Sequence, residues 1–293
     1  MLDFRINTFL AVCQTMNYTE AAKILHITQP AVSQHIHYLE QQYGSKFFQY
    51  EGKQLSLTES GKLFLQTATT IQHDIKHLQE QITSLSTYQY LNFGATLTIG
   101  EYIMPESILH VLKHEPNIQI RMVVENTDEL LKLLNQGKID FAIIEGFFPR
   151  HAYESLTYKE ERFLPVCASD YTFSKPVSRL EDLLSERLLV REDGSGTREA
   201  LERSLMEHNM VIKDFKKLTE LGNLNAIKSL VSAGAGISFF YESAVKVELN
   251  SGLLREIPLE DFYAKHDFTF LWQKGSVFSP YYHKVFELLN GEE

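Results

Sequence analysis

One stretch in the first third of the sequence restricts the fold more than any other feature. Its apolar residues are separated alternately by four and three positions over three heptads, which is typical of a long helix with a narrow apolar stripe. Thr58 can cap this helix, which we expect over residues 59–87. No preceding element is left to cover the stripe, so we expect a coiled-coil dimer; packing against a domain core is the alternative. The stripe consists of Phe64, Ala68, Ile71, Ile75, Leu78, Ile82 and Leu85.

This helix separates a short N-terminal segment from a long C-terminal one, and the charge is divided unevenly between them. The chain of 293 residues has a formal net charge of −10, yet its first 90 residues contain six Lys or Arg and seven Asp or Glu. A nearly neutral segment attracts nucleic-acid phosphates weakly, so a DNA-binding assignment depends on pattern. No apolar run approaches the roughly 20 residues that span a bilayer, and no signal sequence is recognisable, which predicts a cytoplasmic protein.

The N-terminal segment has the start and stop signals of three helices. Asn17 can cap the second helix and Thr28 the third, with Pro30 in its first turn and Gly44 just past its end. Helical spacing from Val32 predicts a buried stripe on the third helix. The opposite face is polar and can hydrogen-bond to base edges in a major groove, although a solvated surface is the alternative interpretation. This face contains Pro30, Ser33, Gln34 and His37.

A hairpin is predicted directly after the third helix. Residues 47–50 and 54–57 have strand-forming sequences and flank a turn at 51–53. Helix, short helix, turn, longer helix and hairpin is the order of a winged helix-turn-helix, in which the second helix of the pair enters the groove. The motif itself would occupy about residues 18–37 of a head that comprises residues 1–58.

The whole head resembles the LysR-type transcriptional regulators. The similarity lies in Ala21-Ala22, Thr28 to Gln34, Leu39-Glu40, Gly44, Phe47-Phe48 and Leu57 to Gly61. It implies a promoter-binding regulator with base and phosphate contacts at Gln29, Pro30, Ser33 and Gln34 and in the wing. Together with Thr28, His37 and Lys53, these residues form the predicted DNA-binding set. The family often has Arg at two wing positions that are Tyr50 and Lys53 here, so one phosphate contact is in question.

The resemblance also has implications for assembly. It implies that residues 59–87 form a dimerising linker helix and that the regulator assembles as a dimer of dimers. RNA polymerase is a further candidate partner.

From residue 88 onward, strands and helices alternate, which predicts an α/β effector-binding domain with a largely parallel sheet. We infer one lobe from residues 91–164 with 266–293, and a second from 165–265. The family resemblance, rather than periodicity, supplies their two-crossover topology, which is similar to that of periplasmic binding proteins. The predicted strands are 91–95, 118–125, 141–144, 163–168, 188–191, 216–220, 236–240 and 268–272, and the predicted helices are 104–115, 128–136, 197–208, 224–232, 243–249 and 281–289.

Ligands of such domains bind beyond the carboxyl ends of strands, at the N-termini of helices. Under the resemblance, Thr96 and Thr98 contact the effector and Glu145 matches a pocket position. A carboxylate there needs a cation, a hydrogen-bond donor or its own proton, and Arg198 is a candidate partner. The hydroxyls and backbone N–H groups favour a small polar carboxylate, zwitterions among them. The predicted effector-binding residues are Thr96, Thr98, Asn126, Glu145, Ser195, Gly196 and Thr197.

Other classes of function have less support in the sequence. A transporter's binding component would require a signal peptide, and an enzyme would require a nucleophile with its base, metal ligands or a nucleotide motif. Cys13 and Cys167 lie far apart in apolar segments, which is typical of small buried residues. Residues 194–198 lack the Gly-Lys-Ser/Thr ending of a phosphate-binding loop, and a helix cap is their alternative role. We therefore expect no catalytic residues, no metal and no cofactor besides the effector.

Overall fold

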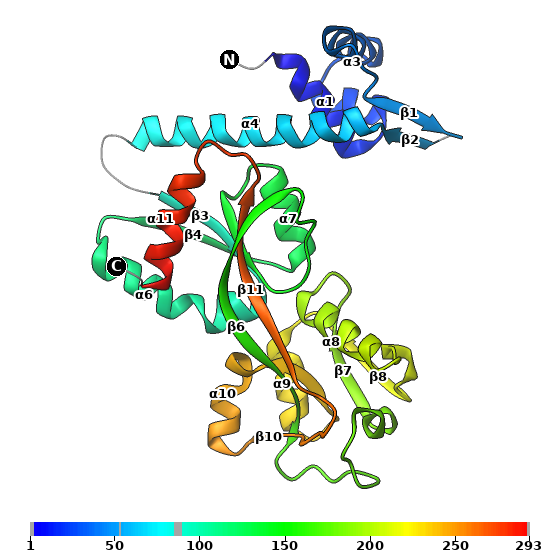
Figure 1. Cartoon of the computed structure of the whole chain (residues 1–293), viewed down its shortest axis with the longest axis vertical. Helices are drawn as coiled ribbons and strands as arrows, with labels where there is room; N and C mark the ends of the chain where they lie inside the picture. Colours follow the sequence, from blue (N-terminus) through cyan, green and yellow to red (C-terminus); the bar gives the residue numbers. More distant parts are fainter. Residues whose placement is uncertain (1–2, 53, 85–89, 292–293) are drawn as a thin grey trace.

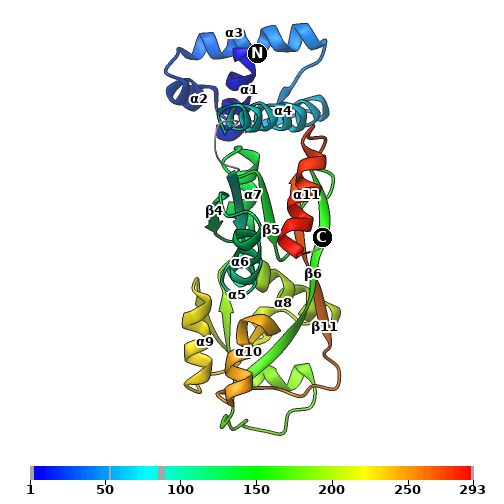
Figure 2. The same cartoon turned by 90° about the vertical axis from the view of Figure 1, so that its left-hand side faces the viewer.

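A computed structural model describes residues 3–52, 54–84 and 90–291 and places three parts in a row (Figure 1). The head lies at one end, the long helix α4 (Glu59–Ser84) crosses the middle, and an α/β domain of two lobes follows. Helix α3 (Gln29–Tyr43) lies on the outer edge of the head, on the side away from the lobes (Figure 2). None of the helices in the described ranges has the length and apolarity needed to cross a bilayer.

The head has the predicted helices, hairpin and caps. The Asn17 side chain accepts the backbone N–H of Thr19 at 2.8 Å, and the Thr28 hydroxyl accepts that of Ala31 at 3.4 Å. Gly44 ends α3 with a φ of 65°, the left-handed conformation that favours glycine. The other elements are α1 (Phe4–Thr15), α2 (Tyr18–Leu25), β1 (Phe48–Glu51) and β2 (Gln54–Leu57). The buried core of the head includes Phe9, Val12, Val32, Ile36, Leu39 and Phe47.

The first turns of α4 belong to the head core. Thr58 caps the helix by accepting the N–H of Gly61 at 2.9 Å. The Phe64 ring stacks on Phe47 with centroids 4.4 Å apart, and Ala68 is buried in the same cluster. The expectation that no head element covers the apolar stripe is therefore wrong for Phe64 and Ala68, because α1 and β2 pack against this part of α4.

The remainder of the apolar stripe is more exposed. Ile71, Leu78 and Ile82 are 39%, 46% and 59% exposed, and Ile75 is half-buried. Leu85 lies outside the described residues. The described part of the stripe beyond Ala68 thus has the exposure that pairing with a second copy requires, and the dimer itself stays a prediction.

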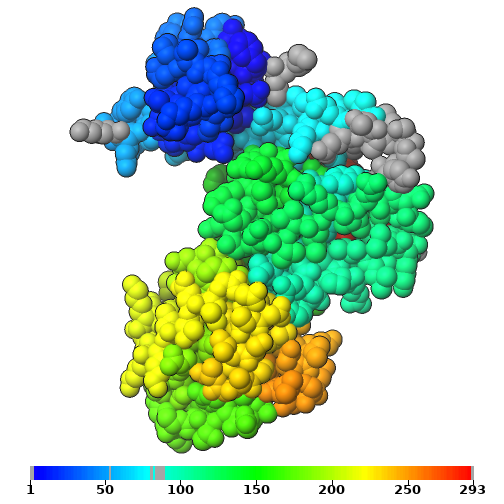
Figure 3. All heavy atoms as spheres, turned by 180° about the vertical axis from the view of Figure 1, so that it is seen from behind, coloured from blue at the N-terminus to red at the C-terminus, as the bar shows by residue number. Residues whose placement is uncertain are grey.

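Two long strands connect the lobes of the C-terminal domain, β6 (Tyr153–Ala168) and β11 (Ala264–Gln273). The predicted lobe limits, 164/165 and 265/266, fall within these strands, and a space-filling view shows an indentation between the lobes (Figure 3). Lobe I contains β3 (Tyr90–Ala95), α5 (Leu97–Tyr102), α6 (Met104–His114), β4 (Gln119–Val124), α7 (Thr127–Asn135), β5 (Phe141–Ile144) and α11 (Ser279–Asn290). Lobe II contains β7 (Arg187–Arg191), α8 (Gly196–Glu207), β8 (Lys217–Leu221), α9 (Leu224–Ser232), β9 (Ser238–Tyr241), α10 (Glu242–Ser251) and β10 (Leu254–Glu256).

The main sheet is mixed rather than largely parallel. Its strand order is β10-β6-β11-β5-β3-β4, and β9 also pairs with β6. Only β3 with β4, β3 with β5, and the separate pair β7 with β8 are parallel ladders among the described strands; β6 and β11 run antiparallel to their neighbours. The sequence pattern predicts only part of each of these two strands, residues 163–168 of β6 and 268–272 of β11. These parts are rich in apolar residues. Four consecutive charged residues, 159–162, obscure the strand alternation in the middle of β6.

One face of α4 is attached to lobe I by polar contacts. Asp74 accepts the Ser276 hydroxyl at 2.5 Å and the Val277 N–H at 3.0 Å. His73 Nε2 lies 3.1 Å from the carbonyl oxygen of Ile139, and burial lowers the pKa of His73, which favours the neutral imidazole as the donor. These buried hydrogen bonds fix the direction of α4 relative to lobe I.

Candidate DNA-binding face and effector cleft

The predicted DNA-binding residues of α3 lie together on its exposed face. Val32, Ile36 and Leu39 are buried on the inner side, as the helical spacing predicts, whereas Tyr43, which the same spacing places in this stripe, is 53% exposed. The Gln29 side chain donates to the Ser33 hydroxyl at 2.9 Å, so the two polar groups are ordered relative to each other. Around them, Thr28, Gln29, Pro30, Gln34 and His37 are exposed and Ser33 is partly exposed.

The wing contributes fewer observations. Tyr50 is 69% exposed near the hairpin turn, and Lys53 lies outside the described residues. The exposed lysines nearest α3 are engaged within the head, since Lys46 pairs with Glu40 at 2.6 Å and Lys23 with Glu20 at 2.8 Å. The Lys53 assignment stays a prediction.

Residues from both lobes meet at the carboxyl ends of the strands. Thr96 follows β3, Glu145 follows β5, and Thr197 lies in the first turn of α8. The Thr197 hydroxyl donates to Glu145 Oε1 at 2.6 Å, across the boundary between the lobes. Within lobe I, the Glu145 N–H donates to the Thr96 hydroxyl at 3.3 Å, and the Thr127 hydroxyl donates to the Glu145 carbonyl at 2.8 Å. Glu145 is thus held on three sides.

Two glycines allow the lobes to approach closely. A Cβ atom on Gly196 would lie 2.2 Å from the Glu145 carbonyl oxygen, and one on Gly146 would lie 2.9 Å from the Gly196 Cα. Gly146 also has a φ of 97°, which side chains rarely adopt. On the same side, Phe147 N–H donates to the carboxylate of Glu199 on α8 at 3.1 Å. The structure therefore represents a cleft whose lobes are in contact.

The carboxyl group of Glu145 is fully buried, and burial raises its pKa. The hydroxyls of Thr197 and Thr98 and the positive charge of Arg191 oppose this rise. Burial is the largest of these influences, so the pKa of Glu145 lies above its ordinary value. Oε2 of Glu145 has no partner within hydrogen-bonding geometry among the described residues.

Arg191 is the cation near Glu145, and the sequence analysis did not select it. The predicted partner was Arg198, and this is wrong: Arg198 forms ion pairs with Asp193, Glu202 and Glu220 at 2.7 to 2.9 Å. Arg191 is only 3% exposed and pairs with its sequence neighbour Glu192 at 2.7 Å. The sequence did contain a signal for Arg191, because this residue ends a buried apolar strand and ligands of such folds bind at the ends of strands.

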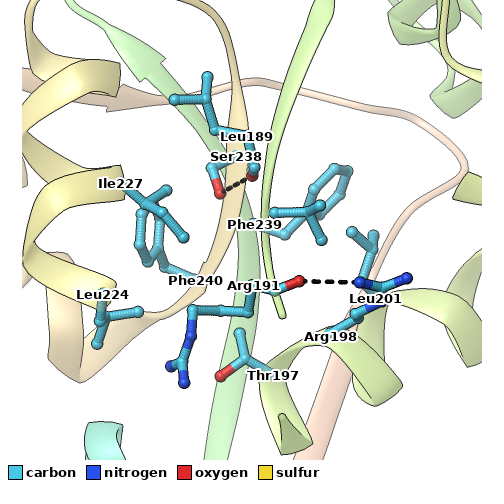
Figure 4. A pocket seen from close by; sticks show the side chains of 11 residues that line it. Leu189, Arg191, Thr197, Arg198, Leu201, Leu224, Ile227, Ser238, Phe239 and Phe240 are labelled. Atoms are coloured by element: carbon cyan, nitrogen blue, oxygen red, sulfur yellow. Dashed lines mark hydrogen bonds between the residues drawn. The ribbon is translucent and has the colours of Figure 1, made fainter. Parts of the chain in front are cut away.

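A small pocket adjoins this cluster in lobe II (Figure 4). The space enclosed by its lining is about large enough for one water molecule. Thr197 is the only predicted effector residue among those that line it. Arg191 also lines the pocket, and its guanidinium points to the side away from Arg198. The remaining lining is mainly apolar, including Leu201, Leu224, Ile227, Phe239 and Phe240.

The other predicted effector residues do not line this pocket. Thr96, Thr98 and Ser195 are buried at the lobe boundary, and Gly196 contacts Glu145 as described above. Asn126 caps α7 by accepting the N–H of Glu129 at 3.0 Å. Its side chain also hydrogen-bonds to the carboxylate of Glu192 in lobe II, which pairs with Arg191. The structure thus brings the threonines and Glu145 together, and it places Asn126 beside the carboxylate partner of Arg191.

The described part of the chain has few of the features by which catalytic sites are recognised. Burial raises the pKa of Cys13 to about 12 and that of Cys167 to about 11, which makes both thiols poor nucleophiles at neutral pH. The described residues contain no group of three or more His, Cys, Asp or Glu arranged to hold a metal ion.

Comparison with known proteins agrees with this organisation. Residues 5–62 match the family model for bacterial regulatory helix-turn-helix proteins of the lysR family, and residues 89–292 match that for the LysR substrate binding domain. An uncharacterised HTH-type transcriptional regulator of Methanocaldococcus jannaschii is 30% identical over 258 residues, 87% of this chain and 86% of that protein. A RuBisCO operon transcriptional regulator of Allochromatium vinosum is 27% identical over 280 residues, 94% of this chain and 91% of that protein.

Solved structures have the same fold at low sequence identity. ArgP of Mycobacterium tuberculosis superposes with a TM-score of 0.65 at 18% identity, over 100% of this chain and 97% of its own. Full-length LysG of Corynebacterium glutamicum, solved with bound effector Arg, gives a TM-score of 0.64 at 15% identity, over 99% and 98%. The chain therefore belongs to the LysR family of DNA-binding transcriptional regulators, with an N-terminal helix-turn-helix domain and a C-terminal effector-binding domain.

Proposed function

We propose that DNA binding by this regulator is controlled by a small polar metabolite that binds between the two lobes. The observation that carries the proposal is the hydrogen bond from Thr197 of lobe II to the buried Glu145 of lobe I. Thr96 and Thr98 lie beside it, also buried. A ligand that binds these groups acts directly on the contact between the lobes. It can therefore shift the population of open and closed arrangements.

The polar contacts between α4 and lobe I provide a route from the cleft to the head. Lobe I carries both Glu145 and the segment 276–277 that binds Asp74 of α4. A rearrangement of the lobes in an assembled regulator would change how the attached α4 helices, and hence the α3 faces, are directed toward DNA. We propose Thr28, Gln29, Pro30, Ser33, Gln34, His37 and Lys53 as the DNA-contacting residues.

We propose the assembly of the regulator from the exposed apolar stripe of α4. The exposed part of the α4 stripe pairs two chains, and two such pairs form a dimer of dimers on promoter DNA. The regulator acts in the cytoplasm, and RNA polymerase is its further partner at the promoter. The effector is the only small molecule required, with no separate cofactor or metal and no catalytic activity.

The DNA-binding part is tested by selecting fragments of genomic DNA on the full-length protein and footprinting the recovered sites. Replacing Ser33 and Gln34 together by Ala should cost about 1–3 kcal/mol per lost base contact and relax the sequence preference. Gln119→Ala, at an exposed position on β4 of lobe I, is the control and should leave the footprint unchanged. An unchanged footprint for the double variant would show that α3 does not read the bases through this face.

The effector part is tested by repeating the footprint with metabolite fractions, using Thr98→Val as the variant. This substitution keeps the shape of the side chain and removes its hydroxyl. A metabolite fraction that alters the footprint of the natural protein should not alter the footprint of the variant. Without any metabolite, the variant should give the same footprint as the natural protein. A response that persists in Thr98→Val would place the effector elsewhere.

A further inference from the structure

Two buried charged side chains in the cleft each have one polar atom without a partner. Glu145 is 1% exposed and Arg191 is 3% exposed. Among the residues that the structure describes, no group hydrogen-bonds to Glu145 Oε2 or to Arg191 Nη1. Buried polar atoms of native proteins nearly always have partners, because an unpaired one loses its solvation without compensation. Two such atoms in one cleft therefore point to a ligand.

The two charges influence each other without forming an ion pair. Thr197 lies between them, since it lines the same small pocket as Arg191 and its hydroxyl donates to Glu145 Oε1 at 2.6 Å. The positive charge of Arg191 also opposes the rise in the pKa of Glu145 that burial causes. The ion pair recorded for Arg191 is with Glu192, through Nε and Nη2, which leaves Nη1 available. Glu145 ends β5 in lobe I and Arg191 ends β7 in lobe II. A molecule between their free atoms would contact both lobes.

We propose that the effector is a zwitterion of the α-amino-acid type, whose ammonium group binds Glu145 Oε2 and whose carboxylate binds Arg191 Nη1. This inference rests on the proposed function, because it names the ligand class for the same cleft. The carboxylate of the ligand lies at the side of the small pocket that Arg191 and Thr197 line. Opening of the lobes admits the ligand, since the contacting lobes leave little space.

Simpler ligands satisfy only half of this site. A plain carboxylate would pair with Arg191 but bring a second negative charge to Glu145, which would then have to retain a proton. A plain amine would pair with Glu145 but leave Arg191 Nη1 without an acceptor. A zwitterion provides a partner for both atoms and adds no net charge to the buried cleft, which lowers the electrostatic cost of enclosing it.

The experiment measures binding to the full-length protein by thermal shift and then by calorimetry. The probes are the common L-amino acids, each compared with the carboxylic acid that lacks its amino group and with the amine that lacks its carboxylate. We expect at least one amino acid to bind, and its two analogues to bind roughly 10- to 100-fold more weakly, the range for losing a hydrogen bond to a charged group. Glu145→Gln keeps the size of the side chain and should weaken the amino acid by a similar factor.

A matched pair of arginine variants distinguishes the proposed contact from general changes in strand β7. Arg187 lies on the same strand but is exposed, does not line the pocket, and donates to the Thr219 hydroxyl at 3.2 Å. Arg191→Lys should weaken amino-acid binding, whereas Arg187→Lys should leave it within about twofold of the natural protein. Equal losses in both variants would overturn the assignment of Arg191. Glu145→Gln provides an independent result if Arg191→Lys fails to fold.

The proposal is overturned if no amino acid binds, or if a matched acid or amine binds as tightly as its amino acid. Footprinting on promoter DNA then tests the ligand class and the control of DNA binding separately. An acid or amine that binds the cleft and alters the footprint contradicts the zwitterion and leaves the proposed function intact. An amino acid that binds as expected but leaves the footprint unchanged supports the zwitterion and contradicts the proposed control of DNA binding.

Discussion

At the scale of single residues, Glu145 should make stability fall as pH rises. Its carboxyl group is fully buried and its folded pKa lies above the ordinary value of 4.5. Between 4.5 and the raised pKa the folded state holds more protons than the unfolded state, so the free energy of unfolding decreases with increasing pH. Each unit by which the pKa is raised corresponds to about 1.4 kcal/mol. Denaturant unfolding of Glu145→Gln should therefore show no such loss through this window.

The difference between the two unfolding profiles is the quantity to measure, because other groups titrate in both proteins. Relative to the natural protein, Glu145→Gln should gain stability steadily as the pH rises above 4.5. Glu125→Gln, an exposed carboxylate in the same lobe, is the matched control and should run parallel to the natural protein. A parallel profile for Glu145→Gln would mean that the group does not carry a raised pKa in the folded state.

The effector cleft could be predicted from the sequence only where position along a strand decides it. Thr96, Glu145 and Thr197 follow strands or begin a helix, and the structure brings them together as their positions predict, while their contact with an effector stays a prediction. Arg191 was missed because a charged residue at the end of a strand usually faces solvent. Its burial depends on the pairing of β7 with β8 and on the contact with lobe I, which are non-local.

At the scale of elements, α4 shows why an apolar pattern identified the helix but not all its neighbours. The heptad spacing correctly predicts a single long helix. It cannot tell that Phe64 and Ala68 lie within reach of the head core, because this depends on where the hairpin lies. The neighbours of the polar face of α4 are even harder to predict from the sequence. His73 and Asp74 have the composition of a solvated surface, yet both are buried against lobe I.

The hydrogen bonds of Asp74 should hold α4 on lobe I. Asp74→Ala removes the acceptor for both the Ser276 hydroxyl and the Val277 N–H. Leaving the buried Ser276 hydroxyl without its acceptor should cost about 1–3 kcal/mol of local stability. Amide hydrogen exchange at residues 276–278 should accelerate accordingly, roughly 5- to 150-fold, when exchange follows local opening.

A control on the same helix separates this contact from helix stability in general. Thr67→Ala replaces an exposed residue whose hydroxyl bonds within α4, to the carbonyl oxygen of Leu63. Exchange at 276–278 should be unaffected there, since Ala favours the helix. Acceleration in both variants would attribute the effect to α4 itself and contradict the role given to Asp74.

At the scale of the whole molecule, the two-lobed arrangement followed from the family resemblance rather than from the local pattern. Alternating strands and helices suggest a parallel sheet, whereas β6 and β11 cross between the lobes and pair antiparallel over most of their length. Such crossings are set by contacts between residues more than 100 positions apart, for example Phe163 with Ala264. No short-range periodicity records pairing at that separation.

The exposed stripe on α4 should hold two chains together. Leu78 and Ile82 are 46% and 59% exposed within one chain, so replacing both by Asp disturbs little of the chain's own core. In a dimer the same change would bury charge in an apolar seam without partners, which is strongly unfavourable. Sedimentation velocity should therefore show a monomer for the double variant under conditions in which the natural protein is dimeric.

Leu63→Asp is the matched control for this experiment. Leu63 is 67% exposed on the same helix but lies outside the 4-3 spacing of the stripe, so the substitution adds the same charge without entering the seam. That variant should remain a dimer and protect two half-sites about one helical turn or a multiple of it apart on DNA. The Leu78–Ile82 variant should lose the paired protection, because one head binds only one half-site and gains nothing from a tethered second head. If it remained dimeric, or if Leu63→Asp dissociated equally, the interface would lie on another face of the molecule, and the exposed stripe would need a different partner.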